Sequence, residues 1–431
     1  MTSAARAVVH RAAQSDFIRQ VAATFATRIG LIGAGVISSV LIARSLGPDG
    51  RGVMAIAAAV TAIAIQFGNL GLHASNTWAV AKDRSLLPTL IANSVAASLA
   101  VGAALIAIVI GVVLVAPHLI ELDAPILAVA LIGIPVGLTT LLLQNLLIGL
   151  QRIRDYNVLE IAARGLAILV TLALIVGRVV SPIAFLLGGT AVSIGILIAT
   201  LYRLRLLAGQ LGRPRWALLQ EYSSFGLRAY SAALASYLVI RIDLFLVQGY
   251  LGFGAAGQYS VAVALADLVY SLPVVIGTLL FPRLAAMTSD TERVSYAAAV
   301  AKRVAALIAH ACVAATLFAD FGVTLLYGNE FRPAVPAFVW LLPGIAALSV
   351  HTVYMNYFAA VGLPTIALLA PTVGLVANLF LNVTLLPTTG LVGASVASTL
   401  AYAFMLGISG CLFLRRRRQV TPPVEGLAIR G

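Results

Sequence analysis

Two stretches of this sequence resemble each other: LGPDGRGVMAIAAAV at 46–60 and LGFGAAGQYSVAVAL at 251–265. Five residues are identical, and the members of each identical pair lie 205 positions apart. The pairs are Leu46 and Leu251, Gly47 and Gly252, Gly52 and Gly257, Ala57 and Ala262, and Ala59 and Ala264. Each stretch follows the first long apolar run of one half of the chain. This placement indicates two halves of similar structure that are parallel repeats, with the same orientation and not an inverted one.

The sequence around these stretches is too apolar for a water-soluble protein. Of the 431 residues, 61% are hydrophobic and only 10% are charged, whereas soluble domains carry about 25% charged residues. Runs of about 20 apolar residues, the length that crosses a bilayer as a helix, recur throughout the chain. They predict an all-α integral membrane protein with transmembrane helices at 17–43, 53–78, 88–115, 125–150, 158–177, 182–206, 223–250, 257–281, 298–320, 334–360, 364–386 and 391–414.

These twelve helices predict an N-terminal lobe at 1–210, a C-terminal lobe at 211–414 and a basic cytoplasmic tail at 415–431. No segment between helices is longer than about 20 residues, so none is large enough for a separate catalytic domain. We therefore do not expect an enzyme. The two cysteines, Cys312 and Cys411, have no metal-ligand spacing, and we expect neither a metal nor a cofactor.

The net charge of +13 arises from short basic clusters between apolar runs, which is typical of membrane topology and argues against nucleic acid as a partner. With the N-terminus placed inside, four basic residues fall in outer loops: Arg44, Arg51, Arg178 and Arg332. Twenty fall on the inner side: Arg6, Arg11, Arg19, Lys82, Arg84, Arg152, Arg154, Arg203, Arg205, Arg213, Arg215, Arg283, Arg293, Lys302, Arg303, Arg415, Arg416, Arg417, Arg418 and Arg430. The bias predicts that both termini are cytoplasmic.

Charged residues inside the predicted helices are the candidates for function, because a charge near the bilayer centre costs about 2.5–3.5 kcal/mol even on the insertion scale. Those at membrane depth, away from the charges that crowd the helix ends, are Arg28, Arg164, Arg228, Arg241, Asp243 and Asp267. Arginine stays protonated at any depth and therefore needs an anionic partner or water. We interpret the four arginines as candidates for binding an anionic substrate, and the two aspartates as candidates for coupling transport to a proton or a cation.

A structural interpretation stays open beside the functional one. Arg28 and Arg241, each on the first helix of its half, would then pair with Asp243 and Asp267 and hold helices together. Two helical positions differ by about 200° around the axis, so Arg241 and Asp243 point to opposite faces of one helix. Arg228, close to a helix end, is also placed to extend its charge to the membrane surface.

Four stretches carry a family resemblance: LIARSLGPDGRGVMAIA at 41–57, RIDLFLVQGYLGFGAAGQYSVAVAL at 241–265, LPVVIGTLLFPRLA at 272–285 and GLVGASVASTLAY at 390–402. They resemble the bacterial polysaccharide flippases of the multidrug/oligosaccharidyl-lipid/polysaccharide exporter superfamily. The resemblance covers most of the chain, although its motifs are mostly glycine, proline and apolar positions.

The resemblance implies two pseudo-symmetric six-helix lobes that form a V around a central cavity in the bacterial inner membrane. It also implies movement of a polyprenyl-diphosphate-linked oligosaccharide from the cytoplasmic to the periplasmic leaflet, for polysaccharide biosynthesis at the cell surface. A polysaccharide polymerase and glycosyltransferases are then candidate partners. Cavities in this family are typically cationic, which agrees with Arg28 and Arg241.

Three other classes of protein remain as alternatives. A cation-coupled drug or metabolite antiporter of the same fold would have a cavity dominated by acids, whereas four arginines face two acids in these helices. A major facilitator would also have twelve helices, but its loop motif is only partly matched by AVAKDRSLLP at 79–88. A membrane-embedded sugar ligase is disfavoured because the loops are short.

Overall fold

The computed structural model describes the backbone of residues 3–117, 120–210, 212–362 and 364–420; within these ranges, side chains at 3–29, 219–229 and 364–367 are not described. Every long regular element in these ranges is an α-helix. The helices are α1 Ser3–Asn69, α2 Leu72–Lys82, α3 Leu87–Val115, α4 Ala124–Gly149, α5 Ile153–Val176, α6 Pro182–Ala208, α7 Trp216–Arg241, α8 Asp243–Ala286, α9 Asp290–Leu317, α10 Ala319–Tyr327, α11 Ala334–Ala360, α12 Pro364–Thr389 and α13 Leu391–Val420.

The described helices are long and apolar enough for a multi-pass membrane protein. Ten helical stretches can cross a bilayer by length and composition. Two of them, 30–69 with 40 residues and 230–286 with 57 residues, are long enough for two crossings each. Both stretches turn sharply at a glycine, so the described part of the chain contains the twelve crossings that the sequence predicts.

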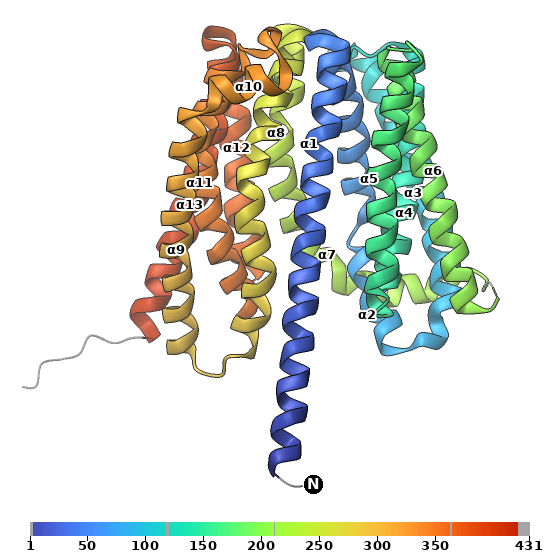
Figure 1. Cartoon of the computed structure of the whole chain (residues 1–431), viewed down its shortest axis with the longest axis vertical. Coiled ribbons are helices and arrows are strands. Elements are labelled where there is room, and N and C mark those ends of the chain that lie inside the picture. The colour runs from blue at the N-terminus through green and yellow to red at the C-terminus, as the bar shows by residue number, and fades with distance from the viewer. Residues whose placement is uncertain (1–2, 118–119, 211, 363, 421–431) are drawn as a thin grey trace, which may run out of the picture.

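The two turns are the duplicated glycines. Gly47 has φ 67° and ψ −176°, and Gly252 has φ 82° and ψ −180°, a conformation that side chains of L-residues rarely adopt. The sequence analysis placed loops at these positions. In the structure, a helix instead lies directly on each side of one glycine. No longer loop is needed, because a single residue with positive φ is sufficient to reverse the direction of the chain. In Figure 1, α1 rises along the molecule and its second leg, after Gly47, descends beside it.

The helices form two lobes. We call α1–α6 the N-lobe and α7–α13 the C-lobe; in Figure 1, α2–α6 lie on one side of α1 and α8–α13 on the other, while α7 passes beneath the N-lobe helices. Of all helix pairs that join the lobes, α1 and α8 pack together most extensively. The largest buried cluster lies mainly in the C-lobe and contains Tyr259, Tyr327 and Phe331. A separate cluster around Leu143, Leu146 and Leu147 holds the N-lobe together.

The lobes meet in a crossing of two glycines. A Cβ atom on Gly52 would lie 1.9 Å from the carbonyl oxygen of Phe253, and one on Gly257 would lie 1.9 Å from that of Pro48. Positions 52 and 257, and positions 48 and 253, are equivalent in the two halves, so the contact is symmetric. Only glycine lets the two backbones approach this closely. We call this region the glycine end of the molecule.

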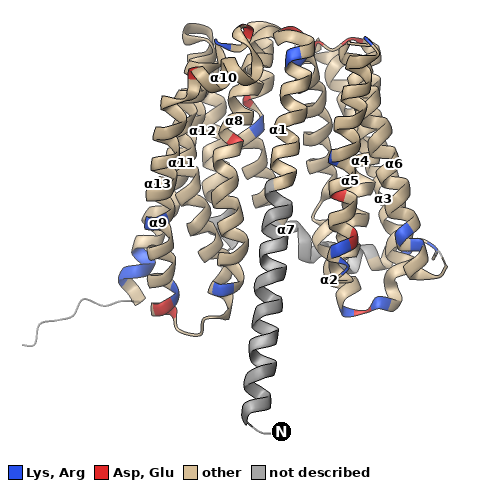
Figure 2. Ribbon diagram, in the orientation of Figure 1, with Lys and Arg blue, Asp and Glu red and all other residues tan. Residues whose placement is uncertain are grey.

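Further contacts between the lobes close the glycine end. The guanidinium of Arg44 donates to the carbonyl oxygens of Leu325 and Leu326 at 2.5 and 2.7 Å. Those carbonyls belong to α10, a short helix that the sequence analysis did not predict. The amide of Gln248 lies 3.4 Å from a carboxylate oxygen of Glu121, which precedes α4. Most of the basic side chains lie toward the opposite end, beyond α2 and at the ends of α9 and α13 (Figure 2).

Several predicted boundaries differ from the observed ones, and three of these differences change how a helix is divided or where it ends. The second predicted helix is interrupted at Leu70 and Gly71, both with positive φ, and continues as α2. The seventh is divided at Ile242, between α7 and α8. The last helix extends to Val420, so the basic run 415–418 lies on α13 and not in a separate tail.

Candidate functional site

Three cavities lie along the second leg of α1, on the side of the crossing away from the glycine end. The N-lobe cavity, about 590 Å³, is open on one side and is lined by α1, α4, α5 and α6. The interlobe cavity, about 240 Å³, lies between α1 and the C-lobe helices α7 and α8. The arginine cavity, about 210 Å³, is lined by both legs of α1 and by α5, and includes Arg51 and Arg164.

The arginine cavity borders both of the others. Arg51 lines it together with the interlobe cavity. Arg164 lines it together with the N-lobe cavity, and so do Ser38, Ile42 and Ala167. A ligand held by the two arginines therefore has space on either side of it.

Arg51 was missed as a site residue by the sequence analysis, which placed it in an outer loop. It lies in the first turn after the Gly47 kink and is half-buried. Its guanidinium donates to the hydroxyl oxygens of Ser39, at 3.1 Å, and Ser260, at 3.2 Å. Because Ser260 belongs to the C-lobe, Arg51 touches both lobes. The duplicated glycines on either side of Arg51 were the signal for a close helix crossing in place of a loop.

Arg164 is a predicted candidate that the structure brings to the cavities. It lies near the middle of α5, and within the described part of the chain it makes no hydrogen bond or ion pair. Glu160, one helical turn earlier, also lines the N-lobe cavity without a described partner. Two arginines with no carboxylate partner, Arg51 and Arg164, thus share one cavity with the hydroxyls of Ser38 and Ser39.

Arg241 is paired with an acid. Its guanidinium lies 2.7 Å from a carboxylate oxygen of Asp267, and each side chain is about one-third exposed, at 35% and 34%. Both line the interlobe cavity. The structure therefore joins Arg241 to Asp267 and not to Asp243, as the helical geometry indicates. In this conformation the charge of Arg241 is compensated, in contrast to those of Arg51 and Arg164.

Asp243 is buried, with only 2% of its surface exposed. One carboxylate oxygen accepts hydrogen bonds from Tyr259 at 2.5 Å and from Ser398 at 3.0 Å. The other oxygen has no hydrogen-bond partner. The network continues from Ser398 to Asn378 at 3.1 Å, and the amide of Asn382 donates to the side chain and the backbone of Asn378. An oxygen of Asn382 is also without a partner, so the buried network holds two unused acceptors.

The remaining predicted candidates, Arg28 and Arg228, lie outside the residues whose side chains are described. Among the described residues there is no group of three or more His, Cys, Asp or Glu side chains placed to hold a metal ion. The described site thus consists of two arginines without a carboxylate partner among the described residues, one ion pair and one buried carboxylate. It is suited to binding a ligand with several anionic oxygens, because guanidinium groups bind such oxygens in planar, bidentate geometry.

Comparison with known proteins gives the family. A family model described as polysaccharide biosynthesis protein matches residues 41–336, more than half of the chain. The probable low-salt glycan biosynthesis flippase Agl15 of Haloferax volcanii is 21% identical over 212 residues, which cover 48% of this chain and 45% of that protein. The chain spans less than half the length of the curated relatives that it matches.

Two solved structures share the fold. The lipid II flippase MurJ, in an inward closed conformation, has a TM-score of 0.72 at 12% identity, over 91% of this chain and 89% of that one. An inward-facing multidrug resistance transporter of the MATE family and MOP superfamily has a TM-score of 0.74 at 13% identity, over 90% and 94%. The chain therefore has the fold of these two transport proteins, in agreement with the all-α membrane fold that the sequence predicts. The extent of the family match decides the identification: this chain is a member of the polysaccharide biosynthesis protein family.

Proposed function

We propose that this protein moves a polyprenyl-diphosphate-linked oligosaccharide across the bilayer, from the cytoplasmic to the periplasmic leaflet, for cell-surface polysaccharide biosynthesis. The observation that carries the proposal is the pair Arg51 and Arg164, which face one cavity at membrane depth without a carboxylate partner among the described residues. A diphosphate supplies several anionic oxygens for two guanidinium groups. The flippase relatives support a lipid-linked substrate of this kind.

The glycine end would face the periplasm in this proposal, and the basic end the cytoplasm. The described conformation, closed at the glycine end, is then the one that precedes release to the periplasmic side. Reporter fusions after residues 120, 210 and 330 should read outside, inside and outside. An inside reading at 120 would contradict the orientation.

Coupling is assigned to the C-lobe. Asp243 and Asp267 are the acids that line the interlobe cavity. A buried carboxylate with one unused oxygen, as in Asp243, is suited to binding a proton or a monovalent cation. Arg241 then releases Asp267 and binds the substrate diphosphate when the two lobes change their relative orientation. Arg28 and Arg228 remain candidates for the same cationic surface.

The test is a comparison of binding and flipping in reconstituted protein. A hydrogen bond to a charged group contributes about 1.5–3 kcal/mol, so Arg51→Ala and Arg164→Ala should each weaken binding of undecaprenyl diphosphate roughly 10- to 100-fold. Arg→Lys at the same positions should restore only part of it, because lysine keeps the charge but lacks the fork. Arg154→Ala, an exposed arginine on the same helix α5, is the matched control and should bind normally.

Normal flipping by the Arg51→Ala, Arg164→Ala double variant would contradict the proposal. A cation-coupled drug or metabolite antiporter is the alternative with the same fold, supported by the likeness to a multidrug transporter. It predicts that the double variant keeps transport and that cationic compounds compete with the proton or cation at Asp267.

A further inference from the structure

We propose that the N-lobe cavity binds the first sugars of the glycan, and that Glu160 and the hydroxyl groups around it select them. This inference rests on the proposed function, because it takes the diphosphate to be held by Arg51 and Arg164. It adds a second subsite whose chemistry differs from that of the anion site.

The position of the cavity follows from the shared lining. Arg164, together with Ser38 and Ala167, lines both the arginine cavity and the N-lobe cavity. A group attached directly to a diphosphate at Arg164 therefore enters the N-lobe cavity next. At about 590 Å³ this cavity is more than twice the size of the interlobe cavity, at about 240 Å³, and lies in the range of small-molecule sites.

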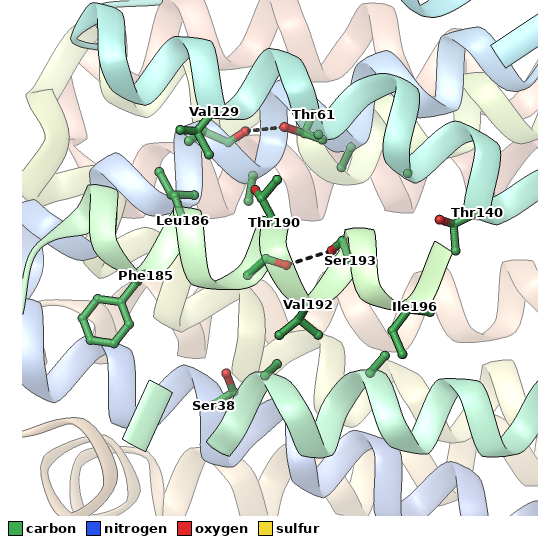
Figure 3. A pocket seen from close by; sticks show the side chains of 18 of the residues that line it. Ser38, Thr61, Val129, Thr140, Phe185, Leu186, Thr190, Val192, Ser193 and Ile196 are labelled. Carbon is green, nitrogen blue, oxygen red and sulfur yellow. Dashed lines mark hydrogen bonds between the residues drawn. The ribbon is translucent and has the colours of Figure 1, made fainter. Parts of the chain in front are cut away.

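Three hydroxyl groups in the cavity are available as acceptors. Thr61 donates its hydroxyl hydrogen to the carbonyl of Ala130 at 2.8 Å, and Ser193 donates to the carbonyl of Gly189 at 2.9 Å (Figure 3). Thr140 donates to the carbonyl of Val136 at 2.8 Å. Because the hydrogen of each hydroxyl is bound to a backbone carbonyl, only the lone pairs of its oxygen are left for a ligand. A ligand that binds these three oxygens does so with O–H or N–H donors.

Glu160 adds a carboxylate acceptor to the same cavity. Its carboxylate lines the cavity, and within the described part of the chain it has no hydrogen bond and no ion pair, not even with Arg164 one turn away. Glu160 is partly buried, and a prenyl chain in this space would cover the carboxylate without giving it a partner, which is costly for a charge. Sugar hydroxyls supply the donors that a carboxylate accepts, so the observations favour the glycan over the lipid chain.

The shape of the cavity depends on one glycine. A Cβ atom added at Gly189 of α6 would meet nothing within 4 Å, although the residue lines the cavity. The glycines of the α4 wall differ, since a Cβ at Gly133 would lie 2.9 Å from Thr61 and one at Gly137 would lie 2.3 Å from Ile65. Gly189 is therefore the position where a larger side chain fills the cavity without displacing a helix.

The experiment compares wild type with Gly189→Leu, which fills the cavity, and Glu160→Gln, which removes the charge at constant size. Gly195→Leu is the matched control: it lies on the same helix, is exposed, has nothing within 4 Å of its Cβ and does not line the cavity. The probes are undecaprenyl diphosphate, bare and carrying one hexose, one 6-deoxyhexose or one N-acetylhexosamine. Affinities are measured in nanodiscs by native mass spectrometry, and thermal melting verifies the fold of each variant.

We expect at least one glycosylated probe to bind wild type about 10-fold more tightly than the bare lipid, the effect of about two typical hydrogen bonds. Gly189→Leu and Glu160→Gln should abolish this gain, and Gly195→Leu should keep it. The inference fails if no sugar raises the affinity, if the gain survives in both variants, or if Gly189→Leu weakens the bare lipid equally, which would place the prenyl chain in the cavity. If wild type binds no diphosphate lipid at all, the proposed function itself fails.

Discussion

The second leg of α1 and the second leg of α8 are equivalent helices with the same backbone and different chemistry. Each begins at a glycine with positive φ, Gly47 or Gly252, and each places a glycine, Gly52 or Gly257, against a carbonyl oxygen of the other helix. The backbone is therefore symmetric across the junction of the lobes, since a contact between two main chains tolerates only glycine on either side.

The side chains that face the cavities do not follow this symmetry. Arg51 of the first half corresponds to Ala256 in the second, which is fully buried, and Asp267 of the second half corresponds to Ala62 in the first. Among the described residues, Arg51 and Arg164 on the N-lobe side have no carboxylate partner. On the C-lobe side, Asp267 is paired with Arg241. The difference shows that the close approach of the two backbones fixes the glycines at the crossing. It places no such limit on the charged side chains that line the cavities, which differ between the lobes.

The largest expected effect is at the symmetric crossing. Gly52→Ala and Gly257→Ala each place a Cβ atom 1.9 Å from a backbone oxygen. Overpacking of this kind costs about 1–3 kcal/mol, so both variants should open the glycine end and abolish flipping. Distances between spin labels on α1 and α8 in the reconstituted protein measure the opening.

Gly33→Ala is the control for the crossing, because it lies on the first leg of α1 with nothing within 4 Å of its Cβ. The two crossing variants should behave alike if the contact is symmetric in energy as well as in geometry. A normal flipping rate in either variant would show that the glycine end does not need this approach.

A smaller effect is expected at Asp243, which has no acidic counterpart in the first half, since Ser38 occupies that position. Asp243→Asn removes the charge from the buried network of Tyr259 and Ser398. Gradient-driven flipping should be lost while binding of undecaprenyl diphosphate stays within about two-fold, because the anion site is separate and distant sites act independently. Flipping with and without an imposed proton or sodium gradient measures the difference.

Asp320→Asn is the control, since its ion pair with Arg332 is exposed. Equal flipping rates for Asp243→Asn and wild type under every gradient would assign the carboxylate a purely structural role. They would contradict the proposal that the C-lobe couples flipping to the gradient.

The smallest effect is expected at the ion pair of Arg241 and Asp267. Because both side chains are about one-third exposed, the pair should contribute about 1 kcal/mol or less to stability. If the pair only holds helices together, Arg241→Ala should lower membrane abundance, and Asp267→Ala added to it should restore both abundance and flipping. If Arg241 also meets the substrate, abundance returns in the double variant but flipping does not. Quantitative blots and flipping rates, measured together, separate the two outcomes.

Much of the site was visible in the sequence because charge at membrane depth is conspicuous. Arg164, Arg241, Asp243 and Asp267 all line cavities in the structure. Arg51 was missed because glycines and a proline on either side of it are typical of a loop. The pairing could not be assigned from spacing alone, since Asp267 meets Arg241 only after the chain reverses at Gly252 within α8.

The sequence by itself determined the membrane environment, the all-helical class and the duplication, because hydropathy and repeated glycines are properties of the chain that need no partner. The tertiary structure alone decided which charges are compensated. Arg51, Arg164 and Arg241 are alike in sequence, yet only Arg241 has a carboxylate within reach among the described residues. The reason is physical: a charge is neutralised by what lies within a few ångströms of it, and those distances are set by how the two lobes pack along α1 and α8.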